Sequence, residues 1–429
     1  MAKQKAETKA NVAWQQIFDK YDILQHIQNE GVFSITADQI KPFYEPRLIT
    51  KFDWSTSLPK LLKSNHLAIL PTNRGTYSIA PFKAYKKLDV KIMKPTPMPL
   101  PDWIQTFDKF DITSEAVALN VAKATGMIDV IMNSPEEFPA VDTITGRIGS
   151  GDFNYNIAMR DNSIYNFTVK KAQVEIDAGF ENIDSMAVIE AKSHIPDDFM
   201  IRQLYHPYRV YYDLGIDKPI LPFYFTYADE VYNFYQYEFK DYNNYSSIQS
   251  VRQFSFIVDK TLNLNIDVVK EISAKSPMLP ESNDFPYPQA NTFPMVLDTI
   301  KYLDQPRDKY ELAEQFSFNS RQSDYYANSV RFLGLATKEH GKYQLNELGR
   351  QVNALPNSNA RNQLIIKQIL SHITFKKAFD SYIRNFGEAD DAYIEQVLGK
   401  YVPNISGSTI PRRVSTVKQW INWIFSVIV

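Results

Sequence analysis

Apolar positions at helical spacing open the chain, and a polar turn between two short apolar runs follows them. Residues 12–30 place an apolar side chain every three or four positions, which predicts a helix. A shorter helical stretch follows at 54–67, and two strands are predicted around the turn Asn73-Arg74-Gly75. Helices followed by a basic hairpin are typical of a winged helix, which places one helix in the major groove of DNA.

The middle of the chain changes to strand patterns. A Pro-rich stretch near residue 97 indicates a linker, and residues 102–132 return to helical spacing. From residue 153 onward the segments NYNIAM, SIYNFTV, AQVEID and MAVIEAKS have the length and apolar content of strands. A helix at 198–214 and two more strands, PILPFYFTYA and EVYNFYQYEF, follow. This helix–strand–strand–strand–helix–strand order predicts a mixed α/β core.

The last third repeats the pattern of the first. Behind a second Pro-rich stretch, MLPESNDFPYPQAN, helices are predicted at 292–303, 309–316 and 319–333. The segment ATKEHGKYQL, with Gly341 at its tip, predicts a hairpin after them, so we expect a second winged helix. Residues 360–429 have mainly helical spacing. The expected domains are a winged helix over 1–97, an α/β core over 98–280, and a winged-helix and helical domain over 281–429.

Composition narrows the classes of protein. Cysteine is absent, which excludes disulfides, thiolate metal sites and a cysteine nucleophile. There is no run of about 18 apolar residues, so no membrane span and no membrane partner are expected. The first segment, MAKQKAETKANVAW, is basic and polar and lacks the apolar core of a secretion signal. We therefore expect a cytoplasmic protein.

Charge is distributed unevenly along the chain, although the formal net charge is only −2. Between residues 36 and 94 there are eleven Lys and Arg residues against four acidic residues, and residues 401–429 have three basic residues and no acid. Basic ends around an acidic middle suit a DNA clamp with a metal site inside it. A mixed, solvated surface explains the same distribution equally well.

The segment QVEIDAGFENIDSMAVIEAKS, residues 173–193, contains the sharpest chemical pattern. Alternate side chains of a strand share a face, so Glu190 and Lys192 point the same way. Asp177 is predicted to close the preceding strand, just before a turn at Ala178-Gly179. If the two strands form a hairpin, Asp177 and Glu190 converge on one cation. The alternative is a salt-bridged hairpin edge, because many surface strands contain a D-x(n)-E-x-K pattern.

Hydrolysis of a phosphodiester needs such an arrangement. Two carboxylates suit Mg²⁺, which prefers oxygen ligands, and the ion neutralises charge on the phosphate and lowers the pKa of a bound water. Lys192 would orient or deprotonate that water and stabilise the developing negative charge. We expect Asp177 and Glu190 to hold Mg²⁺ and Lys192 to be the catalytic lysine.

Other polar residues near this segment allow two interpretations each. Gln203 lies in the helix predicted beside the site, where it either binds the metal-bound water as part of the catalytic set or serves core packing. Glu175 is either an extra ligand or a solvated acid. His194 and His206 lack a second histidine at ligand spacing, so we expect surface roles for them.

At these residues the chain resembles the PD-(D/E)XK nuclease superfamily, with Asp177, Glu190 and Lys192 matching its D, E and K. Ile176 stands where the superfamily usually has Pro. Further stretches, spread over most of the chain, resemble a group of bacterial type II restriction endonucleases: EPRLITKFD, ILPTNRGTYSI, VEIDAGFE, VIEAKS, RQLYHPYR, FPYPQAN and RQSDYYANSVRFLGL. The resemblance implies a PD-(D/E)XK nuclease core with winged-helix DNA readers on either side. It does not supply a recognition sequence.

Sequence-specific DNA binding needs side chains that reach base edges, while Lys and Arg on phosphates position the protein. The reading helix expected in the C-terminal domain begins at residue 319, where Arg321 could pair with guanine and Gln322 or Asn328 with adenine. The stretch GRIGSGDF is predicted to be a turn entering a strand. The other candidate DNA contacts are Arg47, Lys51, Trp54, Ser55, Lys60, Arg74, Arg147 and Ser150. For each single residue, a surface without a DNA contact is an equal alternative.

Three functions are compatible with these patterns. The first is a type II restriction endonuclease that cleaves double-stranded DNA at a short specific site with Mg²⁺. The second is a repair or structure-specific nuclease, and the third is a non-catalytic winged-helix DNA-binding regulator, against which the intact E-x-K argues. Cleavage of both strands at a palindromic site favours a homodimer. A restriction enzyme would act beside a cognate DNA methyltransferase of the same system, not necessarily in complex with it.

Overall fold

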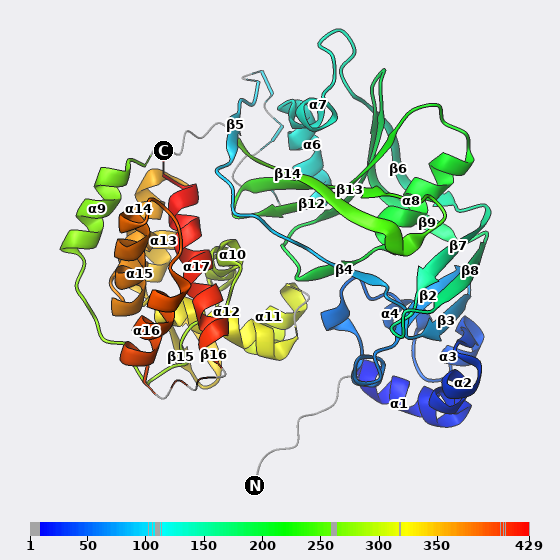
Figure 1. Cartoon of the computed structure of the whole chain (residues 1–429), viewed down its shortest axis with the longest axis horizontal. Coiled ribbons are helices and arrows are strands. Elements are labelled where there is room, and N and C mark those ends of the chain that lie inside the picture. The colour runs from blue at the N-terminus through cyan, green and yellow to red at the C-terminus, as the bar shows by residue number, and fades with distance from the viewer. Residues whose placement is uncertain are drawn as a thin grey trace.

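A seven-stranded mixed sheet lies in the middle of the chain (Figure 1). The structure is a computed structural model that describes residues 9–428 except 102, 105, 108–111, 113, 259–263, 317–318, 404, 406 and 408. The strand order is β5–β14–β13–β12–β10–β9–β6. The strands are β5 (Thr96–Met98), β6 (Val141–Gly149), β9 (Gln173–Glu181), β10 (Met186–Lys192), β12 (Ile220–Ala228), β13 (Val231–Phe239) and β14 (Ile248–Val258).

Helices cover both faces of this sheet at β10. Strands β6, β9 and β10 are antiparallel, and α8 (Arg202–Asp213) then crosses over to β12, which pairs with β10 in parallel. The helices α6 (Glu115–Ala124) and α7 (Met127–Met132) pack on one face and α8 on the other. Every residue of β10 is consequently buried, and its apolar run is interrupted only at Glu190 and Lys192. The mixed α/β core predicted from the sequence is confirmed.

The helical pattern expected at 102–132 is confirmed only in its second half, where α6 and α7 lie. Several residues of its first half, 108–111 among them, lie outside the described residues. Between β6 and β9 the chain forms a separate hairpin, β7 (Asp152–Ala158) with β8 (Ile164–Lys170). A second small pairing joins β4 (Tyr85–Lys87) to β11 (Asp198–Met200), which follows β10 in the chain.

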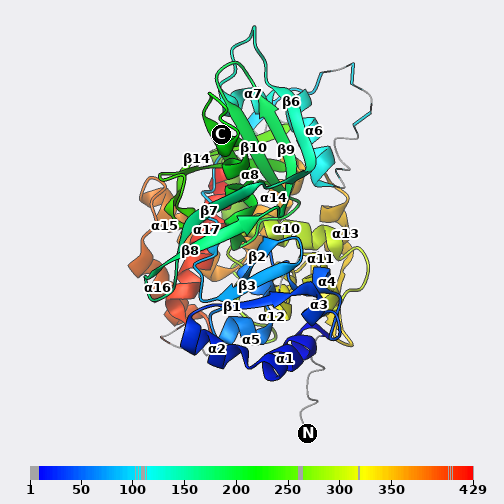
Figure 2. The ribbon, with the colours of Figure 1, turned by 90° about the vertical axis from the view of Figure 1, so that its right-hand side faces the viewer.

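Residues 9–80, here called the N-terminal module, form the blue part of the ribbon in Figure 2. They have an apolar core of their own around Trp14 and Ile35. The single helix expected at 12–30 is two helices, because Asp22 adopts a left-handed conformation (φ 43°) between them. The predicted turn at Arg74-Gly75 is confirmed between β2 and β3. The elements are α1 (Lys9–Tyr21), α2 (Ile23–Glu30), β1 (Phe33–Thr36), α3 (Ala37–Ile40), α4 (Pro46–Ile49), η1 (Ser55–Ser57), α5 (Lys60–Ser64), β2 (Ala68–Asn73) and β3 (Thr76–Ala80), with sheet order β1–β3–β2.

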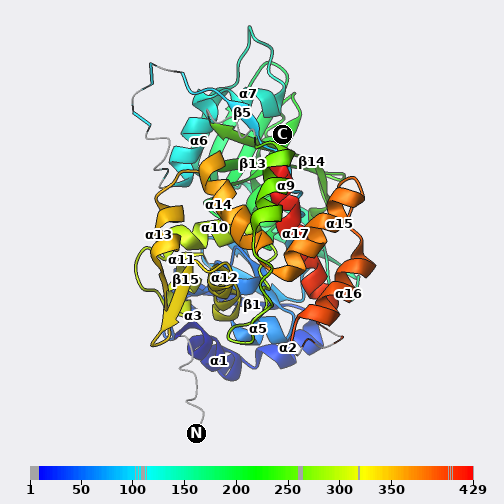
Figure 3. The ribbon, with the colours of Figure 1, turned by 90° about the vertical axis from the view of Figure 1, so that its left-hand side faces the viewer.

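Residues 266–428, here called the C-terminal region, are mainly helical (Figure 3). The three helices and the hairpin expected at its start are confirmed as α10, α11, α12 and β15–β16, with Gly341 (φ 84°) in the hairpin turn. The elements are α9 (Ile266–Lys275), α10 (Phe293–Tyr302), α11 (Lys309–Gln315), α12 (Ser320–Phe332), β15 (Ala336–Glu339), β16 (Lys342–Leu345), α13 (Glu347–Asn353), α14 (Asn359–Leu370), α15 (Ile373–Arg384), α16 (Asp391–Tyr401) and α17 (Ile410–Ser426).

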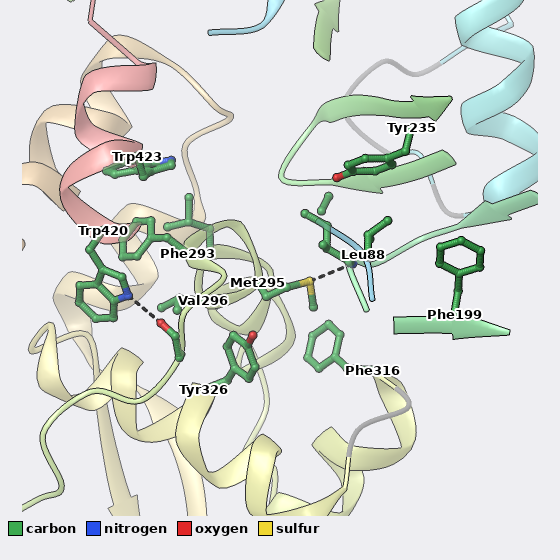
Figure 4. Packing of buried hydrophobic residues seen from close by; sticks show 14 of the residues in the cluster. Leu88, Phe199, Tyr235, Phe293, Met295, Val296, Phe316, Tyr326, Trp420 and Trp423 are labelled. Atoms are coloured by element: carbon green, nitrogen blue, oxygen red, sulfur yellow. Dashed lines mark hydrogen bonds between the residues drawn. The ribbon is translucent and has the colours of Figure 1, made fainter. Parts of the chain in front are cut away.

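Apolar packing joins the C-terminal region to the central sheet (Figure 4). Phe293 lies against Trp420 and Trp423, with ring centroids 4.8 and 4.5 Å apart. The sulfur of Met295, in the same helix, accepts a hydrogen bond from the amide of Ile195 (3.4 Å), which follows β10. None of the helices in the described ranges combines the length and the apolarity that crossing a bilayer requires.

Candidate active site

Asp177 and the E-A-K segment meet on adjacent strands. The Asp177 carboxylate accepts a hydrogen bond from the backbone amide of Ala191 (2.8 Å), between Glu190 and Lys192 in the chain. The turn, however, was expected at Ala178-Gly179, and β9 continues through those residues to Glu181. The actual turn is closed by Asn182, whose side chain accepts from the amides of residues 184 and 185.

The misplaced turn has a physical reason. A Cβ atom on Gly179 would come within 3.1 Å of the Cβ of Ile144 on β6. Glycine therefore serves a close approach between two paired strands, at a point where the β6–β9 register shifts, and not a turn. The sequence pattern of a glycine before polar residues is the same in both cases.

Glu190, Lys192 and Gln203 form a buried hydrogen-bonded set. The Lys192 ammonium donates to Glu190 Oε1 (2.5 Å), and the Gln203 amide of α8 donates to the same oxygen. Glu190 and Lys192 are each 8% exposed. The prediction that the two side chains share a strand face is confirmed by this contact. The two interpretations of Gln203 were binding of the metal-bound water and core packing, and the structure adds a contact that neither included, the hydrogen bond to Glu190.

Burial sets the protonation of this set. It raises the pKa of Glu190 to about 7, with Lys192 opposing the rise and Asp177 and Asp53 adding to it. Burial alone would lower the pKa of Lys192, but Glu190, Tyr224 and Asp53 outweigh it and hold that pKa well above its usual range. The ammonium stays charged at neutral pH, while the carboxyl of Glu190 exchanges its proton near neutrality. Paired acid–base groups with shifted pKa values are typical of functional sites.

A cavity of about 600 Å³ opens beside these residues. Asp177, Glu190, Lys192 and Gln203 line it, together with several residues of the N-terminal module. The oxygens of two carboxylates, Asp177 and Glu190, are ligands that suit a hard, partly hydrated ion such as Mg²⁺. Across the described residues, no three His, Asp or Glu side chains converge closely enough to hold an ion by themselves, so water or substrate oxygens would complete its shell.

Four of the residues expected to contact DNA line this cavity: Arg47, Lys51, Arg74 and Arg147. Lys51 and Arg147 also pair with the exposed Glu175, at 3.6 and 3.3 Å. Glu175 is thus a half-exposed acid between two cations, which agrees with the interpretation of a solvated acid. The basic side chains of two distant segments meet only because the N-terminal module is folded against the sheet.

Other candidates from the N-terminal module attach it to the core. Ser55 donates from its backbone amide to Asp198 (2.8 Å), and its hydroxyl donates to the same carboxylate. The Trp54 ring lies edge-on to His194, with centroids 4.8 Å apart. Lys60 is exposed at the first position of α5. Contacts within the protein therefore occupy Trp54 and Ser55.

Two candidates are corrected by their burial. Ser150 is 5% exposed, and its hydroxyl donates to the Gly151 carbonyl and accepts from the amide of Ala172, so it shapes the turn between β6 and β7 and does not face a DNA backbone. Asn328 is 6% exposed on the inner face of α12, where it donates to the carbonyl of Asp324 (2.8 Å). Its amide is therefore not presented to a base.

The exposed end of α12 carries the two other candidates. The Arg321 guanidinium lies over the ring of Tyr325, 5.6 Å from its centroid, and donates to the Tyr325 hydroxyl. Gln322 donates to the carboxylate of Asp197 (3.0 Å), in the segment that follows Lys192. Arg321 keeps an accessible position for a DNA contact, whereas Gln322 connects α12 to the core.

His194 and His206 are buried, so the expectation of surface roles is wrong. His206 is 1% exposed, and its ring lies edge-on to Phe153. Burial, reinforced by Arg202 and Arg209, holds the pKa of His206 well below its usual range, and burial lowers the pKa of His194 to about 4. Both rings are neutral at physiological pH.

Sequence reasoning missed two acidic side chains near the site. Asp53 lines the cavity from the N-terminal module. Glu115 of α6 accepts a hydrogen bond from the amide of Ser193 (3.1 Å), and burial raises the pKa of Glu115. The only sequence feature that could have pointed to Asp53 is that it is one of four acidic residues in the basic segment 36–94. Glu115 follows the helix cap Ser114 and was part of an unremarked helical pattern.

Comparison with known families divides the chain into three. Residues 11–79, 80–257 and 295–429 are each similar to a domain of unknown function, DUF6996, DUF6997 and DUF7226 respectively. No curated protein and no solved structure matches the chain. The first boundary coincides with the end of β3, and the second range contains the whole candidate site except the residues that the N-terminal module supplies.

Proposed function

We propose that the chain is a magnesium-dependent endonuclease that hydrolyses double-stranded DNA at a short specific sequence, as type II restriction endonucleases do. The observation that carries the proposal is the buried set of Glu190, Lys192 and Gln203 beside Asp177. These residues line a cavity that four basic side chains, described above, also line. A carboxylate pair with an ammonium suits metal-assisted hydrolysis, and the four cations suit a phosphate backbone.

The order of elements supports the same proposal. Helix α6, strands β6, β9 and β10, helix α8 and strand β12 follow the order expected for a PD-(D/E)XK core, with the acidic residues on β9 and β10. The N-terminal module and the segment α10–β16 each have helices followed by a hairpin, as a winged helix does. We interpret them as DNA-binding domains on this basis.

In the proposed reaction Asp177 and Glu190 hold the ion, and Lys192 stabilises the negative charge that develops on the scissile phosphate. Mg²⁺, when bound, would neutralise phosphate charge and lower the pKa of a coordinated water. Gln203 keeps the Glu190 carboxylate oriented through its hydrogen bond to Oε1.

The basic walls indicate where a duplex would run. Arg74, at the tip of the β2–β3 hairpin, also borders a second hollow with Lys170 and Lys171, at the end of β8. A backbone lying along these side chains would pass from the hairpin to Arg147 and then to the catalytic set. The chain is predicted to form a homodimer, as a palindromic target would favour. A separate cognate methyltransferase also stays a prediction.

Cleavage of a mapped plasmid tests the proposal. With Mg²⁺ the wild-type chain should yield discrete fragments, and with a chelator none. Lys192→Ala should lower the cleavage rate by about a thousandfold or more, because the charge beside the phosphate is lost, while DNA binding in chelator persists. Lys270→Ala, an exposed lysine of α9, is the control and should cleave normally.

Three results would reject the assignment. Equal cleavage by Lys192→Ala and the wild type would remove the catalytic role of this site. Structure-dependent nicking without discrete fragments would favour a repair nuclease, and binding without any metal-dependent cleavage would favour a regulator.

A further inference from the structure

The catalytic cavity contains a carboxylate that does not belong to the central sheet. Asp53, from the N-terminal module, lines the cavity together with Asp177, Glu190 and Lys192. Among the described residues, no ion pair or hydrogen bond occupies the Asp53 carboxylate.

Hydrogen bonds from the core fix the backbone around Asp53. The amide of Met200 donates to the Asp53 carbonyl (2.8 Å), and the Tyr85 hydroxyl donates to the carbonyl of Phe52 (2.9 Å). On the other side, Ser55 donates to Asp198. Asp198 and Met200, the residues that make these contacts, are the first and last residues of the short strand β11, which follows β10 in the chain. The position of Asp53 is thus tied to the segment that leaves Lys192.

Buried polar atoms nearby indicate that a ligand belongs in the cavity. Gln203 Oε1 and both ring nitrogens of His206 are buried and lack a hydrogen-bond partner within the described residues, and both side chains line the cavity. A buried polar atom without a partner costs free energy, so such atoms are usually paired with water, an ion or a ligand. Both side chains belong to α8, whereas Asp53 belongs to the N-terminal module.

We infer that Asp53 is a catalytic residue that completes the metal site from the N-terminal module, by accepting hydrogen bonds from water on the ion held by Asp177 and Glu190. The inference rests on the proposed nuclease function. A water-mediated role agrees with the finding that, in the described part of the chain, three acidic side chains do not converge closely enough to bind an ion directly. Catalysis would then require the module to be seated on the core.

Binding of Mn²⁺ to the full chain, measured from the remaining free-ion electron paramagnetic resonance signal, tests this role without any reaction. Asp53→Asn keeps the shape of the side chain and removes its charge. It should weaken Mn²⁺ binding about five- to twentyfold, in the range of effects of outer-shell partners on metal affinity. Asp38→Asn, an exposed acid of the same module, should bind like the wild type.

Cleavage provides the second measurement. At limiting Mg²⁺, Asp53→Asn should cleave at least tenfold more slowly than the wild type and should recover partly at high Mg²⁺, with unchanged DNA affinity in chelator. Ser55→Ala, which removes the hydroxyl contact to Asp198, should reproduce the effect in weaker form, because Asp53 is then held less firmly.

The outcomes separate this inference from the nuclease proposal. If the wild type binds the ion and cleaves DNA but Asp53→Asn does the same, Asp53 has no such role and the nuclease proposal stands. If Asp53→Asn lowers stability or DNA binding but leaves the Mn²⁺ affinity unchanged, the inference is also overturned, because Asp53 would then only hold the module on the core. If Asp53→Asn weakens Mn²⁺ binding in a chain that cleaves no DNA, the metal role holds and the nuclease proposal fails.

Discussion

The N-terminal module and the C-terminal region both begin with helices followed by a hairpin, yet they join the central sheet differently. The N-terminal module is held by polar contacts around residues 52–55 and by the buried side chains of Ala68, Leu70 and Ala80 at the edge of the core, and a cavity of about 600 Å³ lies between the module and the sheet. The C-terminal region is held by a large apolar cluster that runs from Leu88 and Phe199 to Trp420. A cavity of about 710 Å³ borders this second junction as well, and apolar side chains such as Leu88, Phe293 and Trp423 are part of its lining. The two junctions therefore differ in their lining, because several basic side chains, Arg47 and Arg74 among them, line the first cavity.

A buried ionic contact reinforces the C-terminal junction. Arg361 of α14 donates to both oxygens of Asp229 (2.7 and 2.9 Å), at the tip of the β12–β13 hairpin. Both side chains are less than 5% exposed. Asp229 and Glu230 have positive φ angles (50° and 65°), and Glu230 accepts a hydrogen bond from the amide of Asn357. The strained tip is therefore held by groups from the C-terminal region.

This difference teaches how the two parts serve one site. Contacts that are apolar or fully paired and buried give the sheet a fixed support, because water cannot replace them. Polar contacts at the edge of a cavity leave charged side chains such as Arg47 and Arg74 free to meet a ligand. Under the proposed function, the junction of the N-terminal module would meet the substrate, and that of the C-terminal region would support the sheet.

The largest expected effect comes from breaking the buried ion pair. Arg361→Met leaves the Asp229 carboxylate buried without its partner, and removal of one partner of such a pair costs about 3 to 5 kcal/mol. We expect that loss in the free energy of unfolding measured in urea. Lys367→Ala, an exposed lysine of the same helix, should change it by less than about 0.5 kcal/mol. Ser55→Ala at the other junction should lower the free energy of unfolding by only about 1 kcal/mol. Equal losses for Ser55→Ala and Arg361→Met would contradict the comparison of the two junctions.

A second test uses pH to address the C-terminal junction alone. Burial raises the pKa of Asp298 to about 7, with Lys301 opposing and Asp229 adding to the shift. The folded-state pKa exceeds the unfolded value of about 4, so this stabilisation is complete below pH ~4 and is lost as pH rises through about 7. Asp298→Asn keeps an acceptor for the Asp229 amide and should be more stable than the wild type at pH 8 by about 2 kcal/mol, but not at pH 4.

Urea unfolding of both proteins across this pH range measures the effect. Asp304→Asn, an exposed acid that follows the same helix, serves as the control and should show no pH-dependent difference from the wild type. A constant difference between Asp298→Asn and the wild type would contradict the assigned titration.

The smallest expected effect distinguishes the two hairpins. Arg74→Ala removes a cation beside the cavity and should weaken DNA binding by about 1 kcal/mol. The slope of the logarithm of the binding constant against the logarithm of the salt concentration should fall by about 1. Lys342→Ala, in the C-terminal hairpin, should have less effect, because Lys342 lies 3.8 Å from Glu311 and outside the cavity. Fluorescence anisotropy of a labelled duplex at several salt concentrations, in chelator, compares them. A stronger effect of Lys342→Ala would place the main phosphate contacts on the other hairpin.

Short-range patterns account for what could be predicted of the site. The period of a strand puts Glu190 and Lys192 on one face, and an apolar run around them predicts a buried strand; both are borne out. The position of Asp177 beside this strand also agrees with the expectation, although its turn was misplaced. Gly179 was ambiguous because its role depends on Ile144, which lies on a neighbouring strand.

The sequence by itself determined many of the helices and strands, the mixed α/β core and the placement of Glu190 and Lys192 on one face of a buried strand, because these depend on neighbours along the chain. Only the tertiary structure decided that His206 and Asn328 are buried, that Gln322 contacts Asp197, and that Asp53 reaches the cavity. Burial and charge proximity are properties of packed surfaces, and the segments that meet in them are far apart in sequence.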